Sequence, residues 1–201
     1  FLAEISLSAY QQFAPHWQGE WLKMKITWFA DMTFRIQIAG RIIVTHVEGT
    51  PQGIDRTELI AGAQTVISAQ SCDLGQFDPN AWHPRRRLRL IDEEAGDEGL
   101  DLYRFGARGL VAYSVDEGLL VLEDAGVGGQ WNRFADNSVI VLAGSGAQCA
   151  AQGTALLDIA RPRLIALAVD DGEVDSAFDT LVPRLGQASL IVLEPRLAVE
   201  V

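Results

Sequence analysis

The chain has 201 residues, of which 48% are hydrophobic and 21% charged, as expected for a globular protein with one sizeable core or two small ones. Its formal net charge of −11 at pH 7 repels a phosphate backbone, so general nucleic-acid binding is not expected. The longest apolar runs, such as residues 164–169, are far shorter than the roughly 20 residues of a membrane-spanning helix, so no membrane span is expected.

The two cysteines, Cys72 and Cys149, lie far apart and lack the spacing of a metal site, which predicts reduced thiols and a cytoplasmic location. The histidines His16, His46 and His83 are isolated in the sequence, so no zinc site is predicted. The chain starts at Phe1, and whether a targeting segment was removed before it stays open.

Alternating apolar and polar residues predict antiparallel strands in the first part of the chain. Such alternation occurs at 33–38, and the β-branched run at 42–47 predicts the next strand. Two hairpins are also predicted: one joins 87–91 to 100–105 across an acidic turn, and the other joins 110–115 to 119–122. Residues 57–71 suit either a strand or a helix.

The pattern changes after residue 124. Residues 125–137 contain Gly126, Gly128 and Gly129, and beyond them continuous apolar runs alternate with helical segments up to residue 194. Continuous apolar strands are typical of a parallel sheet covered on both faces. We therefore predict an α+β fold: an antiparallel β-rich domain over 1–124, then a small βαβαβ unit over 138–201, with the boundary at 125–137.

Gly144, Ser145 and Gly146 follow a predicted strand and open a predicted helix. Glycines at such a turn let a phosphate approach the backbone, and the helix N-terminus stabilises its charge. Asp170, at the end of the next predicted strand, is placed to bind a ribose hydroxyl, but Cys149 stands where the dinucleotide fingerprint has its third glycine. These four residues are the predicted cofactor-binding site, and a tight turn that binds nothing is the alternative.

Three other features carry weaker signals. Ser145 lies between a strand and a helix as in a nucleophile elbow, but no histidine follows it in the chain. The basic cluster Arg85–Arg87 with Arg89 can bind an anion or pair with the acidic residues after it. Trp17, Trp21 and Trp28 are expected to be core or interface anchors.

No complete catalytic set is present, so we predict a non-catalytic accessory or structural subunit of a cytosolic assembly, with a protein partner or a homo-oligomer. The alternative is a nucleotide- or dinucleotide-binding enzyme, or a subunit of one, that uses the Gly144–Gly146 turn. The cofactor, the reaction and the catalytic residues stay open.

Overall fold

The protein is described by a computed structural model over residues 24–68, 74–85 and 99–201. Within these residues the strands form two sheets, which we name sheet A and sheet B. Sheet A contains β1 (Lys25–Ala30), β2 (Thr33–Ile38), β3 (Arg41–Thr45), β4 (Thr65–Ile67) and β11 (Ala198–Glu200), in the order β11-β1-β2-β3-β4. Sheet B contains β5 (Leu100–Phe105), β6 (Gly109–Ser114), β7 (Gly118–Asp124), β8 (Val139–Ala143), β9 (Leu164–Ala168) and β10 (Ser189–Val192), in the order β10-β9-β8-β7-β6-β5.

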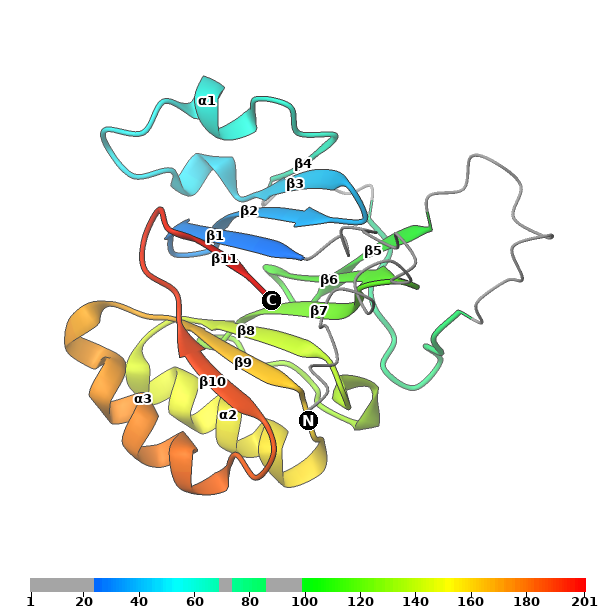
Figure 1. Ribbon diagram of the computed structural model, residues 1–201, viewed down its shortest axis with the longest axis vertical. Helices are drawn as coiled ribbons and strands as arrows, with labels where there is room; N and C mark the ends of the chain where they lie inside the picture. Colours follow the sequence, from blue (N-terminus) through cyan, green and yellow to red (C-terminus); the bar gives the residue numbers. More distant parts are fainter. Residues whose placement is uncertain (1–23, 69–73, 86–98) are drawn as a thin grey trace, which may run out of the picture.

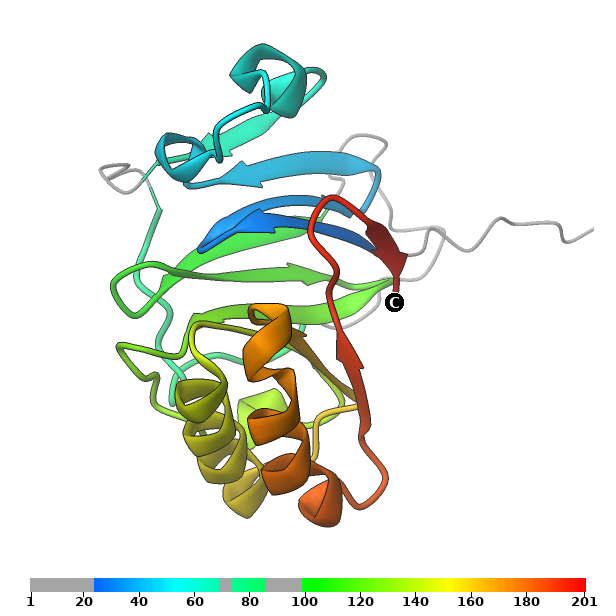
Figure 2. The ribbon, with the colours of Figure 1, turned by 90° about the vertical axis from the view of Figure 1, so that its left-hand side faces the viewer.

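Among the residues that the structure describes, the helices are few, and the two longest lie on one side of the molecule. They are α1 (Arg56–Ile60), α2 (Gly146–Ile159) and α3 (Val174–Leu181), with the 3-10 turns η2 (Val47–Gly49), η3 (Arg133–Ala135), η4 (Asp171–Glu173) and η5 (Val182–Arg184). Figure 1 shows sheet A lying over sheet B, with α2 and α3 on the far face of sheet B. After β10 the chain leaves sheet B and returns to sheet A, where β11 pairs antiparallel with β1 (Figure 2).

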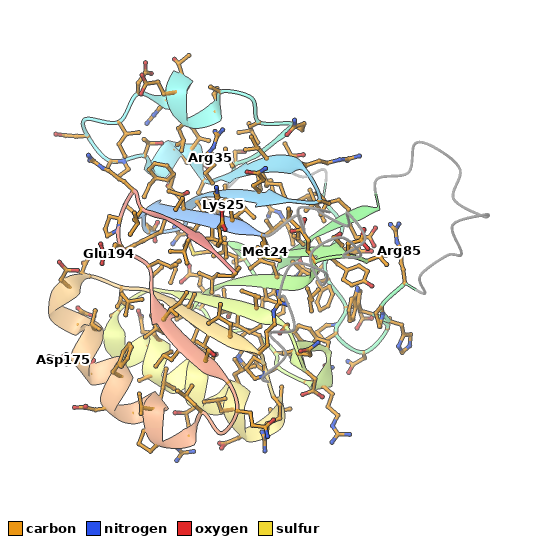
Figure 3. The ribbon with its side chains drawn as sticks, in the orientation of Figure 1. Met24, Lys25, Arg35, Arg85, Asp175 and Glu194 are labelled. Atoms are coloured by element: carbon orange, nitrogen blue, oxygen red, sulfur yellow. The ribbon has the colours of Figure 1, made fainter. Side chains whose placement is uncertain are left out.

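Sheet A folds as its alternating sequence predicts. On β2, Phe34, Ile36 and Ile38 are buried against sheet B, whereas Gln37 is exposed. Arg35 points to the outer face, where its guanidinium donates to the carbonyl oxygens of Leu59 at 2.5 Å and Ala61 at 2.9 Å (Figure 3). Arg35 therefore ties the α1 segment to the outer face of sheet A.

The continuous apolar run of β8 reflects burial on both faces of sheet B. Val139, Val141 and Ala143 face the core between the two sheets. Ile140 and Leu142 face a second core, which the helices and an aromatic cluster cover. Both cores share sheet B, so its central strands have no wet face.

Most of the predicted elements are confirmed. The strands at 33–38 and 42–47 pair antiparallel as β2 and β3, and the predicted hairpin at 110–122 is β6 with β7. The ambiguous stretch 57–71 contains both the short helix α1 and the strand β4. The predicted strand 87–91, most of the basic cluster, Cys72, Trp17 and Trp21 lie outside the described residues.

The α+β class is confirmed, because two mixed sheets dominate the described residues and helices are few. In sheet B, β7 pairs in parallel with β8 across the predicted boundary at 125–137. The division of the chain into domains at this boundary stays a prediction. Within the described residues, no helix is both long enough and apolar enough to cross a membrane.

Candidate functional site

The carboxyl ends of β7, β8 and β9 meet at one edge of sheet B, which we call the strand-end edge. Asp124 ends β7, Gly144 follows β8, and Asp170 follows β9. The three strands are parallel neighbours, and ligands of open α/β sheets gather at this kind of edge. The predicted site residues lie here together with charged residues from both sheets.

Asp31, Arg108 and Asp124 form an ion-pair network that crosses from sheet A to sheet B, here called the cross-sheet clamp. Arg108 lies in the β5–β6 turn, and its Nη1 donates to Asp124 Oδ2 at 3.1 Å. Its Nη2 donates to Asp31 Oδ2 in the β1–β2 turn. Burial lowers the pKa of Arg108, but the hydrogen bond and charge of Asp31, followed by those of Asp124, outweigh it and raise the pKa overall.

His46 joins the same region from the end of β3. It is 5% exposed and has a left-handed backbone, with φ 47°. Its Nε2 lies 2.8 Å from the carbonyl oxygen of Arg108. Because a carbonyl oxygen only accepts, Nε2 carries a proton and donates it to this oxygen.

At the Gly144–Gly146 turn, most of the backbone N–H groups at the start of α2 have partners within the chain. Ser145 is the N-cap of α2, and its Oγ accepts from the backbone N–H of Gln148 at 3.3 Å. The Gln148 side chain in turn accepts from the N–H of Ser145 at 3.0 Å, which completes a capping box. The N–H of Gly146 donates to Glu173 Oε2 at 2.5 Å.

Close packing explains the second glycine of this turn. A side chain at Gly146 would overlap the carbonyl oxygen of Glu173 and the hydroxyl of Ser176, so the glycine lets α3 approach α2. Cys149 is fully buried below the turn, and burial, followed by the charges of Glu173 and Asp124, raises its pKa to about 12. These contacts account for the sequence of the turn without a phosphate.

Asp170 lies close to this turn, since the N–H of Gly144 donates to the carbonyl oxygen of Ala168 at 3.3 Å. It is exposed and precedes η4, and its own carbonyl oxygen accepts from the N–H of Glu173 at 2.8 Å. The structure therefore brings the four predicted cofactor-binding residues to one edge. Their assignment to a cofactor stays a prediction.

Glu123 is a buried acid beside this edge. It is 2% exposed, and its side chain lies near Phe105 and Gly129, where a Cβ at Gly129 would meet both. Burial, followed by the charge of Asp124, raises its pKa from the usual 4.5 to about 8, while a hydrogen bond from the Gly129 backbone acts in the opposite direction. Glu123 is therefore neutral near pH 7.

A cavity of about 650 Å³ opens at the other end of β7, away from the strand-end edge. We call it the aromatic cavity. Its apolar walls are Trp82, Tyr113 and Phe134, and the rings of Trp82 and Tyr113 meet edge to face with centroids 5.3 Å apart. Its polar lining comes from Asn80, His83, Asn132, Arg133, Asp136 and Asn137.

Asn132 holds two walls of the aromatic cavity together. Its Nδ2 donates to the carbonyl oxygen of Pro79 at 2.9 Å, and its Oδ1 accepts from the N–H of Phe134 at 2.8 Å. The hydroxyl of Tyr113 donates to the carbonyl oxygen of Arg85 at 3.3 Å. The cavity is thus shaped by hydrogen bonds that exist without a ligand, as is usual for small-molecule sites.

Comparison with known families and with curated proteins gives no match for the sequence. Two solved structures are similar to the chain. One is Igni18, a metallo hydrolase from the archaeon Ignicoccus hospitalis, with 13% identity, a TM-score of 0.45, and coverage of 89% of this chain and 98% of that one. The other is a putative Zn-dependent hydrolase of the metallo-beta-lactamase superfamily from Thermotoga maritima, with 10% identity, a TM-score of 0.40, and coverage of 84% and 98%. At these values no family is assigned.

Both structures are described as hydrolases, which contradicts the predicted non-catalytic accessory or structural subunit of a protein assembly. That prediction is wrong on this comparison. The nucleotide-binding alternative finds no support in it either, and the N–H groups of Ser145, Gly146 and Gln148 already have partners within the chain. The accessory-subunit prediction is therefore withdrawn, and nucleotide binding at this turn stays an unsupported prediction.

The two descriptions also name a metal, so we tested whether the residues of this chain fit one. Among residues 24–68, 74–85 and 99–201, no group of three or more His, Cys, Asp or Glu side chains is placed to hold a metal ion. At the strand-end edge, the guanidinium of Arg108 lies between the two carboxylates. The described residues therefore do not fit a metal centre.

Sequence reasoning missed the cross-sheet clamp and most of the aromatic cavity. Asp31 and Arg108 are 77 positions apart, and each looks like an ordinary turn residue. Asn132 and Asp136 lie in the stretch that we had interpreted only as a boundary. The one available signal in the sequence was Trp82 next to His83.

Proposed function

We propose that the protein binds a small planar organic molecule in the aromatic cavity. The observation that carries this proposal is the cavity itself, whose volume of about 650 Å³ is within the usual range for ligand sites, about 300–1,000 Å³. Aromatic walls favour a planar ligand. The amides of Asn80 and Asn132 and the opposite charges of Arg133 and Asp136 favour one with polar groups at its rim.

In this proposal the predicted domains have separate roles. The β-rich part contributes Trp82, Tyr113 and Leu119, and the boundary stretch contributes Asn132–Asn137. Arg161, just after α2, supports the boundary stretch, because its carbonyl oxygen accepts from the N–H of Asn137 at 2.8 Å. A protein partner or homo-oligomer and the cytoplasmic location remain predictions.

A screen of planar aromatic acids and amides tests the proposal, with ligand-observed NMR detecting binding to the full chain. His83 and Arg133 line the cavity and are exposed, so His83→Ala and Arg133→Ala should leave the fold intact. Each should weaken the compounds that bind by about tenfold, which corresponds to about 1.4 kcal/mol.

The matched control is Arg56→Ala, because Arg56 is also exposed but lies at the start of α1, outside the cavity. It should leave affinity unchanged. Compounds that bind the native chain and all three variants equally well would place the ligand elsewhere. If no compound in the screen binds to the protein, the proposal is wrong.

A second candidate function is hydrolysis without a metal in the same cavity. It is favoured by His83 and Asp136, which line one cavity and are the residue types that transfer protons in general acid–base catalysis. His83→Gln should lower the hydrolysis of p-nitrophenyl esters by about 10²-fold or more, and a chelator should have no effect. Equal rates for the native chain and the variant would contradict a catalytic His83.

A further inference from the structure

We propose that Arg108 fills a cation site at the strand-end edge, so that the chain itself supplies the positive charge there and the native protein binds no divalent metal at this edge. The site consists of the two carboxylates of the cross-sheet clamp, Asp31 and Asp124. It lies at the opposite end of β7 from the aromatic cavity and is independent of the function proposed above.

The first step is the arrangement of the two carboxylates. Asp31 lies in a turn of sheet A and Asp124 ends a strand of sheet B, yet both accept from one guanidinium. Like charges held this close repel unless a cation lies between them. The planar guanidinium offers several donors in a fixed fork, which suits two carboxylates better than a lysine ammonium does.

The second step is the set of donor atoms around the clamp. Asp124 Oδ1 accepts from the N–H of Gly126 at 3.0 Å, and Asp124 Oδ2 is the atom that accepts from Arg108. His46, the nearby imidazole, directs Nε2 toward the carbonyl oxygen of Arg108. Zinc takes about four nitrogen, sulfur or oxygen ligands, and calcium takes about six to eight oxygens. At this edge, both carboxylate oxygens of Asp124 already accept hydrogen bonds, from Arg108 and from Gly126.

The third step is what the arginine does for the fold. Its side chain joins a turn of sheet A to the end of β7, and its carbonyl oxygen receives the His46 ring from the end of β3. Arg108 therefore connects three loops at one edge of the sandwich. A metal ion bound by the same two carboxylates would have to displace this arginine.

The test uses the full chain, native and variant, with Zn²⁺, Mn²⁺ and Ca²⁺ as probes. Thermal unfolding and metal content after dialysis are both measured. The native protein should retain no stoichiometric ion, and its Tm should not rise with any of the three. Arg108→Ala should lower Tm by about 2 °C or more, because the two carboxylates lose the cation that they share.

The double variant Arg108→Ala with Asp124→Asn should regain part of the lost Tm, because one of the two repelling carboxylates is gone. Arg108→Gln, which keeps some donors, serves as a second variant if Arg108→Ala does not fold. A native protein that holds one ion, and loses it on Asp124→Asn, would overturn the proposal. An Arg108→Ala variant with the native Tm would overturn it as well.

Discussion

Replacing Phe34 by alanine should destabilise the protein by about 3–5 kcal/mol, the range for removing a buried aromatic side chain. Phe34 is fully buried on β2, the middle strand of sheet A, in the core between the two sheets. Its ring has packed side chains from both sheets around it, so the cavity left behind cannot be filled by movement of one loop. Urea unfolding at fixed pH measures the change in the free energy of unfolding.

Gln37→Ala is the matched control for Phe34→Ala. Gln37 lies on the same strand but is exposed, so its replacement should change stability by no more than about 0.5 kcal/mol. The contrast between the two variants tests which face of β2 is buried. A loss below 1 kcal/mol for Phe34→Ala would mean that the two sheets do not share the core described here.

The elements of this fold could be predicted wherever the sequence carries a local period. The alternation at 33–38 predicts a strand with one wet face, and β2 is such a strand. The unbroken apolar run at 139–143 predicts a strand covered on both faces, and β8 is one. Periodicity reports the burial of a side chain, so it is informative in both cases.

The pairing of distant strands could not be predicted in the same way. β11 is a short segment at the end of the chain, and nothing in its sequence indicates that it pairs with β1 in the other sheet. The parallel pairing of β7 with β8 likewise joins strands on the two sides of a stretch that resembles a linker. Such pairings depend on how the two cores pack against each other, and no short stretch of sequence indicates that packing.

The candidate site, too, could be predicted only in part from the sequence. Gly144 and Gly146 have the spacing of a phosphate-binding turn, but Glu173 lies 27 positions from the N–H group of Gly146 that it occupies. A motif specifies which backbone groups could receive a ligand, and tertiary contacts decide whether those groups are already used. Arg108 shows the opposite situation. No sequence motif marks it, but in the folded chain it pairs with two acidic residues.

Glu123→Gln should make the protein more stable than the native chain at pH 8, and the gain should shrink as the pH falls. Burial and the charge of Asp124 raise the pKa of Glu123 from 4.5 to about 8 in the folded state. Between these two values the folded protein keeps a proton on Glu123 that the unfolded chain releases. The folded state binds more protons, so the stability from Glu123 is complete below about pH 4.5 and is lost as the pH rises toward 8.

The size of the effect follows from the width of this window. One pH unit corresponds to about 1.4 kcal/mol, so the difference between Glu123→Gln and the native chain should grow by roughly 3–5 kcal/mol from pH 4.5 to pH 8. Glutamine cannot ionise, and its side-chain oxygen can still accept the hydrogen bond from Gly129. Glu117, whose pKa burial also raises, is present in both proteins and cancels in the difference.

Urea unfolding of both proteins at a series of pH values measures this difference directly. Glu194→Gln is the control, because Glu194 is exposed (Figure 3) and its replacement removes the same formal charge from the surface. Its stability should follow the native curve closely over the whole range. Parallel curves for Glu123→Gln and the native chain would mean that Glu123 ionises equally in both states, and that the space beside Phe105 and Gly129 admits water.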